Sequence, residues 1–357
     1  MIHIPFNQPF LTGQETNYIR QAVESGKISG NGAFTQKCQR FLEERYNFRK
    51  VLLTTSCTDA LEMAAILSKV GPGDEVIVPS FTFVSTALAF VRQGAKIVFA
   101  DSQPGNPNLD LDRVEDLLKP CTKVLVVVHY AGVACDMGRA MDLAKKYHLM
   151  IVEDAAQAID ATYNGQALGG IGHIGCYSFH ETKNIIAGEG GALILNDEQF
   201  VRRSEIIWEK GTNRAEFFRG EINKYGWVDT GSSFLPSEII AAFLYAQLEH
   251  ISTIQAQRKT LWNAYREGLS DLAKQGRIEL PHIPACASNN AHMFHIVCHS
   301  LQERTALIEH LKNNGILAVF HYLPLHKSPY YEPLHDGREL PNADRFADCL
   351  VRLPLYY

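Results

Sequence analysis

Short runs of apolar and β-branched residues alternate with longer segments of helical periodicity through the first half of the chain. The runs lie at residues 51–55, 75–78, 96–99, 123–128, 150–153 and 191–195, with glycine-containing turns at 71–74, 94 and 132. Nearly continuous apolar strands separated by helices are typical of a mostly parallel sheet that is covered on both faces. The pattern predicts an α/β fold.

The later part of the chain has a different pattern. A long helical stretch covers residues 237–265, and short strand-like segments at 277–280, 295–298 and 318–320 surround a helical segment at 302–313. This arrangement predicts a smaller α+β domain at residues 241–357, after a large α/β domain at residues 1–240. The length of 357 residues is in the range expected for two domains.

Composition narrows the possible partners. The formal net charge is -5, with 46% hydrophobic and 20% charged residues. No basic stripe is present that would attract nucleic acid or an anionic membrane, so neither is an expected partner. The first residues lack the basic and apolar regions of a signal peptide, and no window approaches the ~20 apolar residues of a membrane span. We therefore expect a cytoplasmic protein. Its eight cysteines contain no C-x2-C pair, which favours reduced thiols and no metal site.

One lysine and one aspartate carry the strongest chemical signal. Lys183 follows the segment Ser-Phe-His-Glu-Thr at 178–182, precedes the glycine-rich turn 188–191, and stands 29 residues after Asp154. A lysine amine can capture a carbonyl when a pocket holds it against an aldehyde, and an aspartate aimed at a pyridine nitrogen keeps the ring cationic. The pattern predicts a pyridoxal phosphate site. The plainer alternatives are a solvated surface lysine and an aspartate that caps a helix.

Further candidate residues stand at strand ends. Cys57, Thr58 and Asp59 open an apolar helix directly after the strand at 51–55, where their backbone amides could bind a phosphate. A simple Ser/Thr helix cap is the alternative interpretation of this turn. Ser178 could bind the same phosphate.

Two phenylalanines end the strand at 75–78. Phe81 or Phe83 could stack on a pyridine ring, although a phenylalanine is more often a core residue.

Over essentially its whole length the chain resembles the DegT/DnrJ/EryC1/StrS sugar aminotransferases, which have the type I aspartate aminotransferase fold. The resemblance is carried by Gly-Lys-Ile-Ser-Gly at 26–30, Pro-Gly-Asp-Glu-Val-Ile-Val-Pro-Ser at 72–80, His-Tyr-Ala-Gly at 129–132 and Arg-Leu-Pro at 352–354. It implies a homodimer that uses pyridoxal 5'-phosphate. The implied reaction moves an amino group from glutamate to C4 of a dTDP-linked 4-keto-6-deoxy hexose.

The resemblance also implies a role for individual residues. Lys183 would bind the cofactor covalently and later move the proton, and Asp154 would pair with the ring nitrogen. Gln157 would approach the ring hydroxyl and Phe83 would stack on the ring. The implied phosphate ligands are Thr58, Asp59 through its backbone, and Ser178.

One departure from the family concerns the segment before the Ser-Glu pair at 237–238. Ser233 stands where many relatives have an asparagine that reaches the phosphate bound by the neighbouring subunit, and a serine could still donate one hydrogen bond there.

The substrate's diphosphate needs cationic or amide donors as well. The candidates are Lys210, Arg214, Arg219 and His321, followed by the weaker Lys27, Asn31 and His326.

Three other functions remain open at this point. A C3 aminotransferase, or one that acts on a UDP sugar, would share every cofactor residue. A dehydratase of this fold that does not aminate resembles the family but has histidine at the lysine position, which Lys183 disfavours. A noncatalytic regulatory module is the third alternative, and the combined lysine, aspartate and phosphate signals disfavour it.

Overall fold

The computed structural model describes residues 3–357. The strands are β1 (Lys50–Thr54), β2 (Glu75–Pro79), β3 (Lys96–Ala100), β4 (Ser102–Gln103), β5 (Asn106–Leu109), β6 (Thr122–Val128), β7 (Met150–Asp154), β8 (Thr162–Tyr163), β9 (Gln166–Ala167), β10 (Ile174–Ser178), β11 (Gly191–Leu195), β12 (Phe294–Val297) and β13 (Leu350–Leu353). The α-helices are α1 (Glu15–Glu24), α2 (Ala33–Tyr46), α3 (Cys57–Ser68), α4 (Ser85–Val91), α5 (Met137–Tyr147), α6 (Val201–Trp208), α7 (Arg214–Phe218), α8 (Glu238–Glu249), α9 (Ile251–Gly268), α10 (Ser270–Lys274), α11 (Leu301–Asn313) and α12 (Pro341–Cys349). Short 3-10 helices are η1 (Glu115–Leu117), η2 (Tyr130–Gly132), η3 (Glu198–Phe200), η4 (Leu325–Lys327) and η5 (Glu332–Leu334).

A seven-stranded sheet in the order β1-β11-β10-β7-β6-β2-β3 forms the centre of the molecule. The strand pairs from β10 through β7, β6 and β2 to β3 are all parallel, whereas β11 is antiparallel to both of its neighbours. The six apolar runs predicted as strands are all present, and the mostly parallel α/β architecture is confirmed. The direction of β11 follows from the short connection after β10, which contains no crossover helix.

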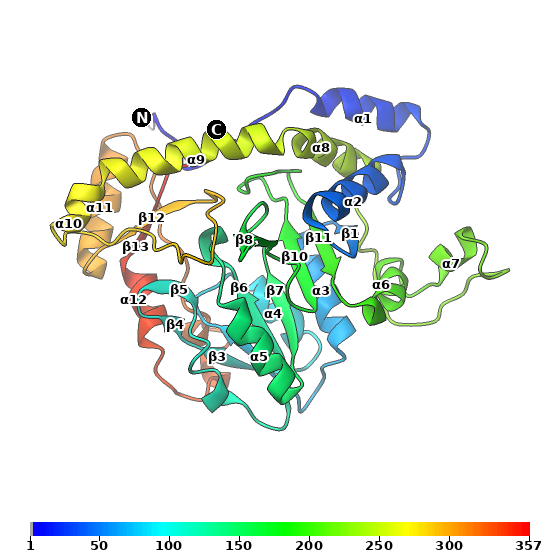
Figure 1. The fold of residues 1–357 in the computed structure, drawn as a ribbon, viewed down its shortest axis with the longest axis horizontal. Helices are drawn as coiled ribbons and strands as arrows, with labels where there is room; N and C mark the ends of the chain where they lie inside the picture. Colours follow the sequence, from blue (N-terminus) through cyan, green and yellow to red (C-terminus); the bar gives the residue numbers. More distant parts are fainter. Residues whose placement is uncertain (1–2) are drawn as a thin grey trace.

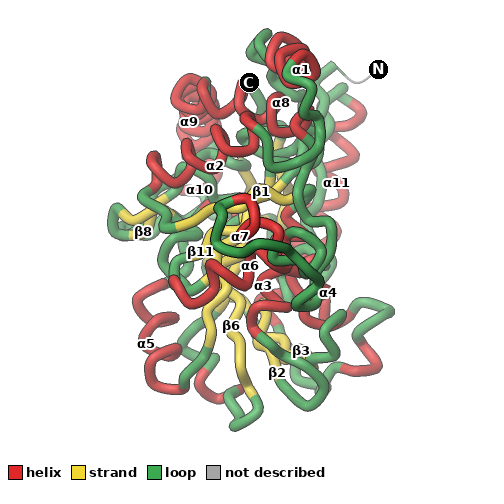
Figure 2. Tube along the Cα trace, turned by 90° about the vertical axis from the view of Figure 1, so that its right-hand side faces the viewer, coloured by secondary structure: helices red, strands yellow, loops and turns green. Residues whose placement is uncertain are grey.

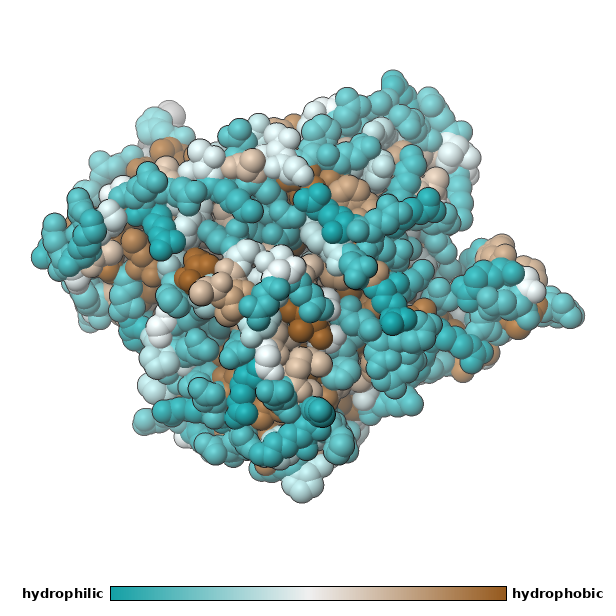
Figure 3. All heavy atoms as spheres, in the orientation of Figure 1, coloured by the Kyte–Doolittle hydropathy of each residue, from teal (hydrophilic) through white to brown (hydrophobic). Residues whose placement is uncertain are grey.

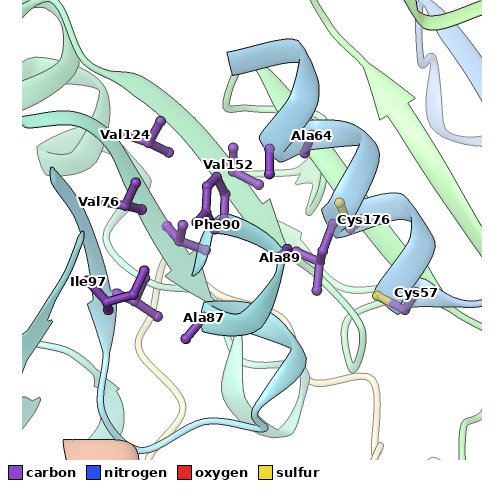
Figure 4. Close-up of a cluster of buried hydrophobic side chains, with 14 of the residues drawn as sticks. Cys57, Ala64, Val76, Ala87, Ala89, Phe90, Ile97, Val124, Val152 and Cys176 are labelled. Carbon is purple, nitrogen blue, oxygen red and sulfur yellow. The ribbon is translucent and has the colours of Figure 1, made fainter. Parts of the chain in front are cut away.

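Helices cover both faces of this sheet. Helix α5 lies on one face and helices α3 and α4 lie on the other (Figures 1 and 2). Alternate residues of a strand point to opposite faces, so Val76 of β2 packs with α3 and α4 while Ile77 packs with α5. Figure 4 shows Val76, Val124 and Val152 from three strands against Phe90 of α4. The sheet is thus buried on both sides, and only its strand ends are available for a site.

In the C-terminal part, the helices predicted from the sequence are present, whereas two of the predicted strands are not. The helical stretch divides into α8 and α9, and the segment 302–313 is α11. The segments 277–280 and 318–320 make only isolated bridges, Glu279 with Val297 and Val319 with Arg352. The first segment stops at Pro281, which has no N–H to extend a ladder. The strand prediction was therefore wrong for these two segments. The division at residue 240 stays a prediction.

A projecting arm, residues 209–233, leaves the body between α6 and α8 and carries α7 (Figure 1). A bridge between Glu209 and Ser233 closes its base. The arm is unusually apolar on its surface, since Trp227 is 84% exposed and Phe218 is 67% exposed. Figure 3 shows brown, hydrophobic residues on this arm beside teal, hydrophilic ones.

Within residues 3–357, no helix is both long and apolar enough to span a bilayer. All eight cysteines are free thiols.

Candidate active site

A cavity of about 540 Å³ lies at the carboxyl ends of the parallel strands. Asp154 ends β7 and Ser178 ends β10, and these neighbouring parallel strands bring both side chains to the same edge of the sheet. Lys183, Phe83 and Thr58 line the same cavity. These five residues, which the sequence pattern selected from four separate segments, are therefore gathered around one space.

Lys183 stands in the loop that connects β10 with β11. Backbone hydrogen bonds hold this loop, from the Lys183 amide to the His180 carbonyl and from the Ala187 amide to the Phe179 carbonyl. The Lys183 amine donates no hydrogen bond to any atom of residues 3–357. Burial lowers its pKa to about 8, and the positive charge of Arg352 acts in the same direction. The lowered pKa makes a larger fraction of this amine neutral near physiological pH than in an exposed lysine, as a nucleophile or base requires.

Asp154 is a buried carboxylate with few partners. One oxygen accepts a hydrogen bond from the Thr86 hydroxyl at 2.7 Å, and the other accepts one from the Ala156 amide at 3.2 Å. Burial raises the pKa of this carboxyl, although the bonds from Thr86 and Ala156 oppose the rise. A cationic ring nitrogen in the cavity would stabilise the ionised form, because an opposite charge offsets the cost of burial.

The start of α3 provides two free amides. Within the described residues, the amides of Cys57 and Thr58 bond to no acceptor, and both residues line the cavity. The Asp59 amide instead donates to the Ser56 hydroxyl at 3.1 Å, which caps the helix. A helix N-terminus with free amides suits an anion. Both interpretations of this turn therefore hold. Ser56 caps the helix at the Asp59 amide, and the free amides of Cys57 and Thr58 form an amide cradle for an anion.

A glycine allows the strand beside this turn to approach closely. A Cβ atom added at Gly191, the first residue of β11, would lie 2.4 Å from the Ser56 carbonyl carbon and 2.5 Å from the Cys57 amide nitrogen. Any side chain there would displace the amide cradle. The glycine-rich segment 188–191 thus contributes to the site by leaving room for backbone.

The structure distinguishes the two phenylalanines. Phe81 is 1% exposed and packs against Tyr130 and Phe346, so it belongs to the core. Phe83 is 56% exposed and forms part of the cavity wall, with its ring centroid 6.2 Å from that of Tyr322. Phe83 is therefore the one placed to meet a ring.

Gln157 lines the same wall and has two partners. Its side-chain oxygen accepts the Ala131 amide at 2.6 Å, and its nitrogen donates to the Tyr322 hydroxyl at 3.0 Å.

Ser233 and most of the diphosphate candidates lie outside the cavity. Ser233 is an exposed residue at the base of the arm, and Lys210, Arg214 and Arg219 stand on the arm itself. Arg219 pairs with Glu205 at 2.8 Å and Glu221 at 2.7 Å.

The remaining diphosphate candidates divide in the same way. His321 lines the cavity, whereas His326 is buried against Ser80 at 2.7 Å and the Lys27 amine bonds to the Asn31 carbonyl. Only His321 of these seven candidates therefore reaches the cavity of its own chain.

Several cavity residues were not identified as site residues from the sequence. Thr86 comes from the first turn of α4, and Tyr322, His292 and Arg352 come from the C-terminal part of the chain. Arg352 belongs to the segment 352–354 that carries the family resemblance, and this was the available signal. Among residues 3–357, no three His, Cys, Asp or Glu side chains converge as metal ligands.

These features fit pyridoxal phosphate. The cavity offers an amine without a partner, a buried carboxylate with spare acceptor capacity, two free amides at a helix N-terminus and an exposed aromatic face. Each matches one group of the cofactor: aldehyde, ring nitrogen, phosphate and ring. The fold and this site together define a pyridoxal phosphate-dependent aminotransferase.

Comparison with known proteins gives the family. The model of the DegT/DnrJ/EryC1/StrS aminotransferase family matches residues 9–357, and the chain belongs to this family. The spore coat polysaccharide biosynthesis protein SpsC of Bacillus subtilis is 29% identical, over 99% of this chain and 92% of its own. GDP-perosamine synthase of Caulobacter vibrioides is 31% identical, over 91% and 86%.

Solved structures agree with this assignment. The pyridoxal phosphate form of the putative sugar aminotransferase Spr1654 from Streptococcus pneumoniae superposes with a TM-score of 0.90 at 28% identity. The superposition covers 99% of this chain and 94% of that one.

Proposed function

We propose that this enzyme transfers the amino group of glutamate to C4 of a dTDP-linked 4-keto-6-deoxy hexose. The product would be a dTDP-4-amino-4,6-dideoxy sugar for a cell-surface polysaccharide. What supports this acceptor is a resemblance of the segments 172–184, 210–214, 217–220, 290–294 and 319–322 to dTDP-4-amino-4,6-dideoxygalactose transaminase of enterobacterial common antigen synthesis. The observation that carries the catalytic part of the proposal is that the Lys183 amine, which bonds to no group of residues 3–357, lines the same cavity as Asp154.

The cofactor, when bound, would supply an aldehyde that accepts the amine and a cationic ring that withdraws electrons from the reacting carbon. Asp154 would hold the charge on the ring nitrogen, because the carboxylate is buried and still has acceptor capacity. The amides of Cys57 and Thr58, with the Ser178 hydroxyl, would hold the phosphate.

Lys183 would perform the proton transfer. Its amine, which bonds to no other group of residues 3–357, could accept and return a proton near neutral pH, because burial lowers its pKa to about 8. Phe83 and Gln157 would fix the ring from its face and its edge, so that the proton moves at one carbon only.

We also propose a homodimer. Ser233 and three of the diphosphate candidates stand on or at the base of an arm that projects from the body, outside the cavity of their own chain (Figure 1). They could act on a bound substrate only in the cavity of a second copy. Sedimentation at micromolar concentration tests this, and a monomer that retains full activity would contradict it.

A single-turnover experiment tests the reaction. Purified protein with pyridoxal phosphate is mixed first with glutamate and then with a dTDP-linked 4-keto-6-deoxy hexose, while the cofactor's visible band is followed. We expect glutamate to remove the band and the sugar to restore it, with nitrogen at C4 of the product by NMR. Nitrogen at C3, or a band restored only by a UDP-linked or GDP-linked keto sugar, would replace the proposed substrate. The relatives named for GDP-perosamine make the GDP-linked sugar a necessary comparison.

A further inference from the structure

His180 presents one fixed ring nitrogen and one unused ring nitrogen. It stands in the loop that carries Lys183 and lines the same cavity. Its Nδ1 accepts the Thr182 amide at 3.2 Å and lies 2.9 Å from the Thr182 hydroxyl. A backbone amide only donates, so this Nδ1 carries no proton and Nε2 carries one. The ring therefore offers a single N–H donor whose direction is set by the loop.

The carboxylate of Glu189 stands beside that donor. Its Oε1 is 3.6 Å from the His180 Nε2, which is too long for a hydrogen bond. Within residues 3–357, neither the carboxylate nor Nε2 bonds to any other group, and both residues line the cavity. A donor and an acceptor are thus held side by side with both left free. A polar gap of this length is one that a third group can bridge.

The backbone of the loop holds the two side chains together. The Glu181 amide donates to the Gly188 carbonyl at 2.9 Å, and the Phe179 amide donates to the Gly190 carbonyl at 2.8 Å. These bonds pair the neighbours of His180 with the neighbours of Glu189 across the loop. The arrangement is therefore built by main-chain contacts and does not depend on an attraction between the two side chains.

Another histidine–carboxylate pair of the same chain provides the contrast. The His326 Nε2 is 3.5 Å from the Asp344 Oδ1, outside the cavity. The His326 Nδ1 is 2.7 Å from the Ser80 hydroxyl, and the Asp344 carboxylate accepts from the Lys327 amine at 2.6 Å. Each member of that pair is already used by the protein. The pair of the Lys183 loop has no such partners, which indicates a ligand.

The chemistry of the His180–Glu189 pair selects the group that it can bind. One hydroxyl can accept from an N–H and donate to a carboxylate at the same time. A carboxylate or a diphosphate only accepts, and the negative charge of Glu189 repels it. The pair therefore suits a neutral hydroxyl. It disfavours the carboxylates of the amino donor and the diphosphate of the nucleotide.

We propose that His180 and Glu189 bind the hydroxyl on C3 of the keto sugar and select for it, an assignment that rests on the proposed function. Lys183 is on the same loop and must lie beside the reacting C4. The C3 hydroxyl is on a ring carbon bonded directly to C4, whereas the other neighbour, C5, bears the methyl group of a 6-deoxy sugar. The pair thus distinguishes an acceptor with a C3 hydroxyl from one without it.

Two variants, each assayed with two acceptors, test this assignment. His180→Asn retains an acceptor for the Thr182 amide and removes the N–H donor, and Glu189→Ala removes the carboxylate. With the dTDP-linked 4-keto-6-deoxy hexose, kcat/KM should fall about 5- to 10-fold in His180→Asn and about 10- to 100-fold in Glu189→Ala. With the 3-deoxy analogue of this sugar, both variants should stay within about 2-fold of the wild type, because the bonded hydroxyl is already absent. Glu309→Gln and His310→Gln, at exposed positions of α11, are the matched controls.

Steps that do not involve the sugar ring give a second readout. Loss of the cofactor band with glutamate, and binding of dTDP alone by calorimetry, should both stay within about 2-fold of the wild type in the two variants. Equal losses with the two sugars would mean that the loop has been deformed. A loss confined to glutamate would assign the pair to the amino donor, and weakened dTDP would assign it to the nucleotide. Each of these results overturns the proposal.

Failure of this inference can be told from failure of the proposed function. If the wild type prefers the sugar with the C3 hydroxyl and both variants lose that preference, the assignment stands. If the wild type converts both sugars equally well, only the C3 assignment fails. If the wild type consumes glutamate but converts neither sugar, the proposed acceptor fails and the assignment fails with it.

Discussion

Glu153 and Asp154 are consecutive residues at the end of β7, and their carboxylates have opposite kinds of surroundings. Glu153 is fully buried and accepts from the His129 ring at 2.9 Å, from the Gly169 and Ile171 amides at 2.7 Å each, and from the Gly172 amide. Asp154 accepts only two hydrogen bonds and lines the cavity. Alternation along a strand sends the two side chains to opposite faces of the sheet. A saturated carboxylate organises the fold, and one with spare capacity is available to a ligand.

The His129 ring makes the difference clearer. The Cys135 amide donates to its Nδ1 at 3.2 Å, which makes that nitrogen an acceptor and Nε2–H the donor to Glu153. The four donors that face the Glu153 carboxylate therefore all have it as their acceptor. On the cavity face, the Lys183 amine and the amides of Cys57 and Thr58 have no acceptor among the described residues 3–357. The comparison predicts that changes on the first face reduce stability and changes on the second reduce activity.

The largest expected effect is that of Lys183→Met. Activity should fall about 10⁴-fold, the upper end for loss of an acid/base group, because the same amine also forms the link to the cofactor. Stability should not fall, since the amine has no partner to lose. Steady-state rates and thermal melts measure both quantities, with Lys312→Met, an exposed lysine of α11, as the control. A variant that melts well below the wild type would place Lys183 among the structural residues.

Glu153→Gln tests the face of the sheet on which Glu153 lies. An amide in place of one carboxylate oxygen would point its own donors at two of the four groups that now donate to Glu153. We expect a loss of roughly 3–5 kcal/mol in the free energy of unfolding, the usual cost of breaking a buried charged network. Urea unfolding measures it, with the exposed Glu198→Gln as the control. A stable Glu153→Gln variant with reduced activity would reverse the roles assigned to the two residues.

Asp154→Asn makes the matching substitution on the cavity face. An asparagine retains an acceptor for Thr86 and loses the charge for the ring nitrogen. The turnover rate should fall about 100-fold, in line with the loss of a buried charged partner. The melting temperature of the cofactor-free protein should stay within a few degrees of the wild type, because burial already disfavours the charge. Equal destabilisation by Asp154→Asn and Glu153→Gln would remove the distinction between the faces.

The sequence alone predicted one side of this comparison well. Asp154 and the pair Phe81 or Phe83 were predicted because they follow apolar runs, and the carboxyl ends of parallel strands meet at one edge. Lys183 and Ser178 were predicted from the segment 178–183 and the glycine-rich turn after it, and the family resemblance favoured Phe83. Local periodicity is sufficient for the strand-end positions. It could not distinguish Glu153 from its neighbour, because the difference is made by groups that other segments bring to each carboxylate.

The partners that were missed come from tertiary packing. Thr86 is 68 residues from Asp154 and Tyr322 is 165 residues from Gln157 along the chain. Their hydrogen bonds depend on how α4 and the C-terminal segment pack over the sheet. The sequence also could not show that the Asp59 amide is already bonded, because this depends on which hydroxyl caps α3.

The smallest expected effect is a pH dependence of stability that arises from Lys183 on the cavity face. The pKa of Lys183 is about 8 in the folded protein and ordinarily 10.5. Below pH 8 the amine is protonated in both states, and the cost of holding the charge in the cavity is fully present. Between pH 8 and 10.5 the folded state has released the proton while the unfolded state still binds it, so stability rises with pH.

Lys183→Met, which lacks this cost, should melt above the wild type at pH 7 in cofactor-free protein. The gap, on the order of a few degrees or less, should narrow as pH rises from 8 to 10.5. Comparison of the two proteins cancels the tyrosines and cysteines that titrate in the same range. A gap that stays constant over this interval would mean that the amine has the same pKa in both states, and that the cavity does not hold it as an unpartnered charge.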